Sequence, residues 1–325
     1  MQDCTRCNLR PMRPEPSDDR VSVEASVIIP TYNRSDILER VLCRITDQSY
    51  PCDRFEVVVV DDGSTDNTGS MVASFESSVQ LRYLRQEHRG PAAARNYGVR
   101  EARGGVIIFL DSDIQVNRDF VAEHMKVHSN RRGLVGRGLV INTENQDNPF
   151  VEKKKLTDMS TAFFATGNVS VRKEYLVEVG LFDEDFREYG WEDLELGVRL
   201  KKLGLAVISV SGAIGYHYQR KPRTGDLSEI CSKERMRGRT AVLFYRKHPT
   251  FEVRCMTHMS RVFFALDRLL NPGGWMDSPE TLRRLRYFER KKARVCTSFL
   301  MGLMRSHAYL EGAREVLLAE ETEKM

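Results

Sequence analysis

Features that would place this 325-residue chain in a membrane or outside the cell are missing from its sequence. No run of about 18 apolar residues occurs, so the sequence predicts no membrane-spanning helix. The first 20 residues, MQDCTRCNLRPMRPEPSDDR, lack the apolar stretch of a secretory signal. The seven cysteines, an odd number scattered along the chain, do not have the pattern of a disulfide framework. We therefore expect a cytoplasmic protein.

The chain also has little net charge. A formal charge of +4 is too small to indicate a nucleic-acid partner. The charge is nevertheless uneven, because residues 220–325 contain 22 Lys and Arg against 13 Asp and Glu, a net +9, and the remainder carries −5. A basic C-terminal third predicts an anionic partner such as phosphate or a membrane surface, and the alternative is a solvated helical face.

Apolar runs alternate with amphipathic segments in the first third of the chain. Residues 1–22 are rich in Pro, Arg and Asp without periodicity and predict a disordered leader. Strands are expected at 26–30, 57–60 and 106–110, helices from Ser35 and over 91–102, and a further helix and strand within 68–85. Continuously apolar strands that alternate with helices predict an α/β fold with a parallel sheet covered on both faces. Ligands of such sheets bind beyond the carboxyl ends of the strands.

The pattern is looser in the rest of the chain. We expect a strand over 160–171, a helix over 192–203, a last strand over 206–210 and helices from 228 onward. One helical stripe combines Met256, Met259, Phe263, Leu266 and Leu270. We expect this stripe to be buried against the rest of the protein, and the alternative is an interface.

Polar residues follow the first two strands at the predicted ligand edge. After the first strand come Pro30, Thr31, Tyr32 and Arg34, in which Tyr32 offers a flat face for a base and Arg34 a cation for phosphate. After the second strand comes a turn with two carboxylates, Asp61 and Asp62. A carboxylate there can accept a hydrogen bond from a pyrimidine ring N–H, and the alternative is a capped turn without a ligand.

Two further carboxylates follow the strand that ends at Leu110. In Asp111-Ser112-Asp113 the acidic groups stand at i and i+2, where their repulsion is costly unless a cation joins them. A hard divalent ion bridging these oxygens to a pyrophosphate would resolve that repulsion. The sequence therefore predicts a metal and diphosphate site at this strand end.

Taken together, these segments resemble the family 2 glycosyltransferases of the GT-A fold. The matching motifs, in order along the chain, are VIIPTYNR, VVVVDDGSTDNT, GPAAARNYGV and IIFLDSD. Later motifs around 166–168, 180–184 and 190–197 are similar to the acceptor half of galactosyl- and N-acetylgalactosaminyltransferase domains, including chondroitin-type polymerases. The resemblance covers residues 25–220. It implies a GT-A domain over 23–225 with a central, mostly parallel sheet, followed by a helical region over 226–325.

The resemblance also implies roles on the donor side. Asp111 would contact the ribose, and Asp113 the metal, with His217 completing a metal shell that includes this acidic pair. An imidazole ligand favours Mn²⁺ over Mg²⁺, although a lone histidine is often structural. Arg95 is the other cation expected near the donor. The basic residues after the last strand, expected to close over the diphosphate, are Arg220, Lys221 and Arg223.

On the acceptor side, the Glu192–Asp193 pair opens a helix. We expect Asp193 to be the general base and Glu192 to bind the acceptor or support the base; the alternative is that both acids favour the helix dipole. Trp191 supplies a ring face for stacking a sugar, or is a core tryptophan. Gly167 and Asn168 complete the expected acceptor contacts.

This constellation predicts an inverting transferase that moves a hexose or N-acetylhexosamine from a UDP-sugar to a saccharide or lipid-linked saccharide. No covalent nucleophile is needed, because one base and one metal suffice for a single displacement. A sugar nucleotidyltransferase fits less well, since the PTYNR segment lacks that class's Gly-rich loop. A non-catalytic carbohydrate-binding relative fits less well because both acidic pairs are intact. The basic C-terminal helices would lie on the inner face of the cell membrane, form a homodimer interface, or simply pack as a bundle.

Overall fold

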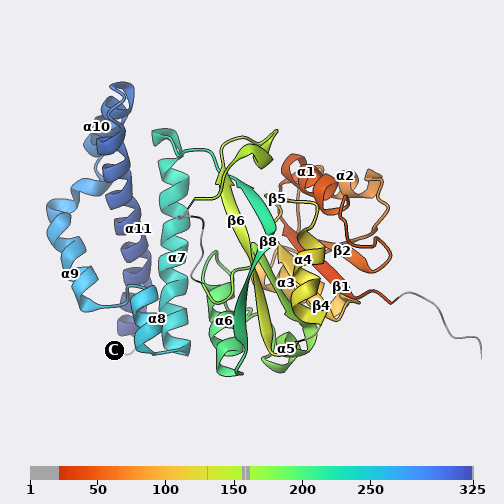
Figure 1. Ribbon diagram of the computed structural model, residues 1–325. Helices are drawn as coiled ribbons and strands as arrows, with labels where there is room; N and C mark the ends of the chain where they lie inside the picture. Colours follow the sequence, from red (N-terminus) through yellow and green to blue (C-terminus); the bar gives the residue numbers. More distant parts are fainter. Residues whose placement is uncertain (1–21, 130, 156–157, 159–161, 324–325) are drawn as a thin grey trace, which may run out of the picture.

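The computed structural model describes residues 22–129, 131–155, 158 and 162–323. The predicted leader therefore lies outside the described residues, apart from Ser22. Figure 1 shows an α/β unit with a layer of C-terminal helices against one side. The strands are β1 (Ala25–Thr31), β2 (Phe55–Asp61), β3 (Gln80–Arg85), β4 (Val106–Leu110), β5 (Ile114–Val116), β6 (Leu134–Thr143), β7 (Asn168–Arg172) and β8 (Ala206–Tyr218). The α-helices of the α/β unit are α1 (Ser35–Ile45), α2 (Thr68–Ser74), α3 (Pro91–Glu101), α4 (Phe120–Ser129), α5 (Lys173–Glu178) and α6 (Glu192–Lys202).

One eight-stranded mixed sheet organises the α/β unit, with the strand order β3-β2-β1-β4-β7-β6-β8-β5. β1 to β4 are mutually parallel, as predicted, whereas β7 is antiparallel to both β4 and β6. β6 and β8 are parallel, and the three-residue β5 pairs antiparallel with the end of β8. The β5–β8 pairing joins the segment just after β4 to the end of β8, so it positions one half of the site against the other.

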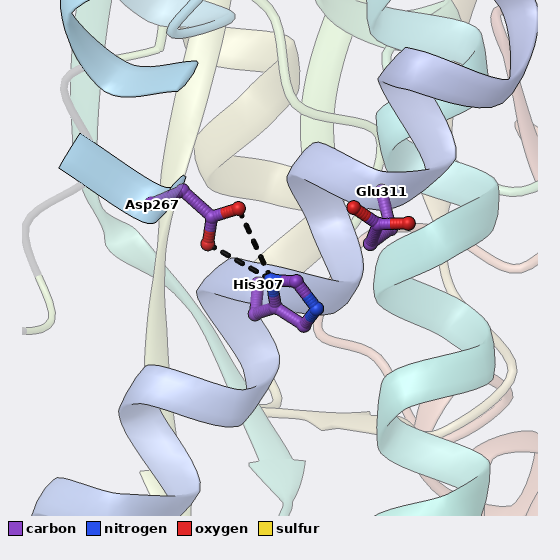
Figure 2. Close-up of side chains that lie close together, drawn as sticks. All are labelled: Asp267, His307 and Glu311. Atoms are coloured by element: carbon purple, nitrogen blue, oxygen red, sulfur yellow. Dashed lines mark hydrogen bonds and ion pairs between the residues drawn. The ribbon is translucent and has the colours of Figure 1, made fainter. Parts of the chain in front are cut away.

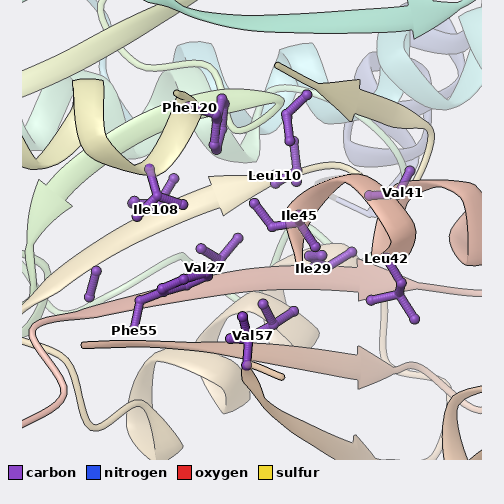
Figure 3. Packing of buried hydrophobic residues seen from close by; sticks show 14 of the residues in the cluster. Val27, Ile29, Val41, Leu42, Ile45, Phe55, Val57, Ile108, Leu110 and Phe120 are labelled. Carbon is purple, nitrogen blue, oxygen red and sulfur yellow. The ribbon is translucent and has the colours of Figure 1, made fainter. Parts of the chain in front are cut away.

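A continuous apolar core lies between the sheet and α1. Every residue of β2 and β4 is buried, which explains the apolar runs over 57–60 and 106–110. Figure 3 shows Leu42 and Ile45 of α1 packing near Ile29 and Val57. α3, rich in alanine, packs on the other face, where Gly98 lets the helix approach Ile28 closely. This two-sided burial holds the carboxyl ends of β1, β2 and β4 at one edge of the sheet.

The C-terminal helices form a bundle on the far side of α6 (Figure 1). α7 and α11 cross closely at two glycines: a Cβ at Gly238 would stand 1.9 Å from the Tyr309 carbonyl oxygen, and one at Gly312 would stand 2.1 Å from that of Arg235. None of the helices in the described part of the chain is both long and apolar enough to cross a bilayer. The elements are α7 (Leu227–Lys247), α8 (Phe251–Met256), α9 (Arg261–Leu270), α10 (Pro279–Arg290) and α11 (Arg294–Glu323).

Three sequence expectations are wrong. Among the described residues of 160–171 only 168–171 are in a strand, because β7 begins at Asn168. The last strand continues to Tyr218, so His217 lies within β8 rather than after it. The stripe from Met256 to Leu270 is divided between α8 and α9 by a turn with His258 at φ +54°, and most of it is not buried.

Candidate active site

The loops after β1 and β2 are fastened to each other by short hydrogen bonds. The backbone N–H of Asn33 donates to Ser64 Oγ over 2.8 Å, and the N–H of Thr65 donates to Asn33 Oδ1 over 2.8 Å. Asp66 accepts from the N–H of Ser35 over 3.1 Å. Asn33 adopts φ +51°, a left-handed conformation that asparagine tolerates better than most residues. The two loops therefore form one preorganised rim.

The Asp61–Asp62 turn is buried and strongly hydrogen-bonded. Asp61 accepts from the Ser64 N–H over 2.8 Å and from the Tyr83 hydroxyl. Asp62 accepts from the N–H groups of Arg89 and Gly90, each over 2.9 Å. Both carboxylates thus shape the surrounding loops, and a contact from either to a pyrimidine ring stays a prediction.

Tyr32 provides an exposed ring at this rim. Its side chain is 43% exposed and stacks on His88, with ring centroids 4.4 Å apart. His88 is held in turn by Asp62, at 2.8 Å from Nδ1. The stacked pair presents an exposed aromatic surface on which a nucleobase could stack.

Asp113 and His217 meet across the β5–β8 pairing. His217 Nε2 lies 3.6 Å from Asp113 Oδ2, and Asn142 Oδ1 lies 3.2 Å from His217 Nδ1. Arg34 forms an ion pair with the same Asp113 oxygen. Burial raises the pKa of Asp113, but His217 and Arg34 outweigh it and hold that pKa at about 2. Asp113 is therefore an ionised carboxylate beside an imidazole, which is a donor pair suited to a divalent ion.

Arg95 joins a residue predicted to bind the donor to one predicted to bind the acceptor. Its guanidinium is buried on α3 and donates to Asp111 over 3.2 Å and to Glu192 over 2.9 Å. Asp111 thus reaches toward the arginine, and Asp111, Asp113 and His217 do not form a compact three-residue ligand cluster. Arg95 links Asp111 to Glu192, so two of the acidic segments that the sequence predicts to converge do meet.

Several predicted site residues carry a buried polar atom without a partner among the described residues. Among the described residues, four buried side-chain atoms lack a hydrogen-bond partner: Thr31 Oγ1, Arg95 Nε, Arg172 Nε and Glu192 Oε2. Leaving such an atom unsatisfied costs about 1–3 kcal/mol. Three of these four atoms belong to predicted site residues, so the site retains hydrogen-bonding capacity for a ligand.

Asp193 has the environment of a general base. Burial raises its pKa most, neighbouring Glu192 raises it further and Arg95 lowers it, to a value of about 7. Asp193 is in the first turn of α6, and its Oδ1 accepts from the N–H of Leu194 over 2.7 Å. A carboxyl group that titrates near neutral pH can both hold and release a proton under working conditions.

Two residues expected to contact the acceptor are buried. Trp191 is 7% exposed, donates from Nε1 to the Arg237 carbonyl over 2.9 Å and packs on Phe244, which favours the alternative of a core tryptophan. Asn168 is buried, and its amide is saturated by His124 and the carbonyls of Leu139 and Ala213. It has no polar atom free for a sugar and instead ties the sheet together.

Gly167 lies against the acidic site. A Cβ at this position would stand 3.2 Å from Asp111 Oδ2, so the glycine keeps the space beside that carboxylate open. Pro30 is half-buried at the end of β1, and Ser112 is buried between the two acidic residues. Their predicted contacts with the donor remain predictions.

The basic residues after β8 are exposed and engaged at the surface. Arg220 forms an ion pair with Asp226 at 2.7 Å, and Lys221 pairs with Glu144. The backbone N–H of Arg223 donates to Asp226 over 2.8 Å. Surface pairs of this kind contribute about 0–1 kcal/mol, so they can exchange for a diphosphate at little cost. Closure over a donor stays a prediction.

A compact group with metal-ligand chemistry lies elsewhere, in the C-terminal helices. Within the described residues, the ligand atoms of Asp267, His307 and Glu311 all lie within 4.8 Å of one another (Figure 2). Arg314 forms ion pairs with both acidic members, at 2.7 Å from Asp267. A guanidinium already neutralises these carboxylates, and we assign the group a structural role.

Comparisons with known proteins decide the family. The sequence profile described as "Glycosyl transferase family 2" matches residues 26–180, and that of the "N-terminal domain of galactosyltransferase" matches 150–221. An uncharacterized glycosyltransferase, YfnE of Bacillus subtilis, is 31% identical over 268 residues, which cover 64% of this chain and 68% of that protein. The chain belongs to the family 2 glycosyltransferases. It is therefore an enzyme of the glycosyltransferase class.

Other relatives of this glycosyltransferase are longer. Chondroitin synthase of Escherichia coli is 30% identical over 273 residues, covering 70% of this chain but only 40% of that protein. Among solved structures, the mannosyltransferase PcManGT from Pyrobaculum calidifontis, in complex with GDP-Man and Mn²⁺, has a TM-score of 0.59 at 22% identity, covering 88% of this chain and 86% of the other. This likeness confirms the GT-A fold.

Sequence reasoning missed the residues that support the glycosyltransferase site. Tyr83, His88 and Asn142 contact Asp61, Tyr32 and His217 respectively, and none stands in a motif. Each comes from a segment distant in sequence, so its partner is fixed by the topology. The left-handed Asn33 was detectable in principle, because asparagine after a strand often marks a turn.

Proposed function

We propose that this glycosyltransferase moves a hexose or N-acetylhexosamine from a UDP-sugar to a saccharide or lipid-linked saccharide, with inversion and with Asp193 as the general base. The observation that carries the proposal is the buried Arg95 bridge. It joins Asp111, at the donor end of β4, to Glu192, which adjoins Asp193 at the start of α6. Donor and acceptor groups are thereby held in one rigid constellation.

The donor would lie along the β1–β2 rim. Tyr32 would stack on the base and Arg34 would face phosphate, while Asp111 would accept from the ribose. The Asp61–Asp62 turn, with its resemblance to UDP-sugar transferases, supports uracil as the base. A nucleotide lying here would also cover Thr31, whose buried Oγ1 has no hydrogen-bond partner in the described part of the chain.

The residues beside the donor diphosphate fit a divalent ion. Asp113 is ionised and Asn142 orients His217, so one carboxylate and one imidazole would hold Mn²⁺, or Mg²⁺, near Asp111. When bound, the ion stabilises the negative charge of the departing nucleotide diphosphate. A Mn²⁺ ion is also present in the PcManGT structure.

Asp193 would take the proton of the acceptor hydroxyl as that oxygen attacks the anomeric carbon. The sugar–phosphate bond breaks on the opposite face, so an α-linked donor yields a β-glycoside. Glu192, with one oxygen on Arg95 and the other without a partner, would orient the acceptor. Arg95 limits the repulsion between the two neighbouring carboxylates and lowers the pKa of Asp193.

The test is a donor panel followed by determination of product configuration. UDP-linked galactose, glucose and their N-acetylamino forms are supplied in turn, and release of UDP and the anomeric signal of the product are followed by NMR. We expect a β-linked product, loss of transfer in EDTA and recovery with Mn²⁺. An α-linked product would contradict inversion, and full activity in EDTA would contradict the metal roles of Asp113 and His217.

A further inference from the structure

Helix α9 packs Phe264 against the C-terminal helices but leaves most of its large apolar residues exposed. Its one buried residue is the charged Asp267, whereas Val262 and Leu269 are 72% and 75% exposed. The exposed large apolar residues of this helix are Val262, Phe263, Leu266, Leu269 and Leu270. At 100° per residue they occupy one continuous arc of about 120°, and Asp267, which contacts α11, lies just beyond Phe263 at one end of that arc. We call these five residues the α9 apolar face.

A buried polar cluster holds the helix in this orientation. Asp267 lies 2.9 Å from His307 Nδ1 of α11 (Figure 2). It also lies 2.7 Å from Arg314, on the same helix. His307 Nε2 lies 3.0 Å from Asp277, which follows α9. Removing one partner of such a buried charged group leaves the others uncompensated, so rotation of α9 to bury its apolar residues would be costly. The ion pairs of Asp267 therefore keep the α9 apolar face exposed in the folded protein.

The segment of chain that contains α9 and α10 is basic. Residues 261–300 contain nine Lys and Arg against four Asp and Glu, a net charge of +5. Arg261 and Arg268 are exposed on α9 itself, and exposed Arg283 and Arg284 lie on α10. Two copies of this chain joined through the face would bring like charges together. An anionic surface would instead be attracted to the arginines while the apolar side chains enter it.

We propose that the α9 apolar face docks on a bilayer containing anionic phospholipid, with α9 lying in the plane of the interface. A ten-residue helix is about 15 Å long, which suits shallow insertion and not a span. The protein would thus be held peripherally at a membrane through its C-terminal helices, with the α/β unit beyond them. This attachment is separate from the sugar-transfer chemistry.

The full chain is tested by flotation with phosphatidylcholine vesicles that contain or lack phosphatidylglycerol, at ~0.05 M and ~0.5 M NaCl. We expect binding only to the anionic vesicles, weakened at high salt. The double variant Val262→Asp/Leu269→Asp should lower the partition coefficient about tenfold or more, because two inserted apolar side chains become charged. Both positions are exposed, so folding should be unaffected, which thermal melting checks.

Two further variants complete the design. Val177→Asp changes an equally apolar residue that is 59% exposed on α5, and it should bind like the parent. Arg283→Glu/Arg284→Glu should weaken binding and reduce its salt dependence, since it removes attraction without touching the apolar face. The proposal is overturned if the parent protein does not float with anionic vesicles, or if the Val262/Leu269 variant floats equally well. A dimer that this variant dissociates, without vesicle binding, would assign the face to a second copy.

Discussion

At the scale of single residues, Arg95 is the cation that pairs with the buried carboxylates of the site. It is buried yet shared between Asp111 and Glu192, and Asp193 lies within its field. Charged groups are tolerated in such surroundings only when they are paired, and the pairing here is incomplete because Glu192 Oε2 and Arg95 Nε lack partners. These buried charges therefore lower the stability of the folded protein and are retained at the site for its chemistry.

Because Asp193 is one of these buried groups, the stability of the Asp193→Asn variant should differ from that of the parent in a pH-dependent way. The folded protein raises the Asp193 pKa from its ordinary 3.8 to about 7, so between these values the folded state binds more protons than the unfolded state, and stability falls as pH rises. Asparagine escapes this loss. The variant should gain about 1 kcal/mol or more at pH 8, several degrees in Tm, and nothing near pH 4. Thermal melts across that range check it; a constant difference would contradict the raised pKa.

At the scale of elements, β1, β2 and β4 could be predicted because each contains a continuous apolar run that the sheet buries. β1, β2 and β4 and the helices between them follow the sequence pattern to within a few residues. β5 could not be predicted, since three residues are too few to show a period and their pairing with β8 depends on long-range topology. The burial of Trp191 and Asn168 also could not be predicted, because a sequence motif does not reveal which distant residues pack on its members.

The crossing of α7 and α11 gives a second prediction. Gly238→Ala places a Cβ within 1.9 Å of the Tyr309 carbonyl oxygen, and we expect a loss of about 1–3 kcal/mol from overpacking. Gly302→Ala is the matched control: it lies on α11 with no atom within 4 Å of its Cβ position. It should be neutral or stabilising by up to about 1 kcal/mol through helix propensity. Chemical denaturation of both variants distinguishes them, and equal stabilities would refute a close helix contact.

At the scale of the whole molecule, the proposed boundary between residues 225 and 226 does not separate two independent cores. Phe186 and Trp191 of the α/β unit share one hydrophobic cluster with Phe244 of α7 and Tyr309 of α11. The segment from Gly190 to Asp193, which contains the proposed base, is thus held in place by the packing of Trp191 against α7 and α11. The helical region supports the active site as well as presenting the α9 apolar face.

A chain cut after residue 225 should consequently lose its stability. Removing the helices exposes Trp191 and Phe186. The free energy of folding gained by burying each side chain, about 2–3 kcal/mol, would be lost. We expect the fragment to aggregate or to melt without cooperativity, as followed by size-exclusion chromatography and thermal denaturation. A monomeric fragment that melts cooperatively would show that residues 23–225 fold as a separate domain.

The most direct test of the account is the transfer rate of Asp193→Asn measured beside its affinity for the donor. Asparagine preserves the shape of the side chain but cannot accept the acceptor's proton. We predict that UDP-sugar binding, measured by calorimetry, stays within about threefold of the parent while transfer falls about 100-fold or more. Glu192→Gln is the companion variant, expected to weaken acceptor binding. Unchanged transfer by Asp193→Asn would contradict the role given to this residue and, with it, the proposed mechanism.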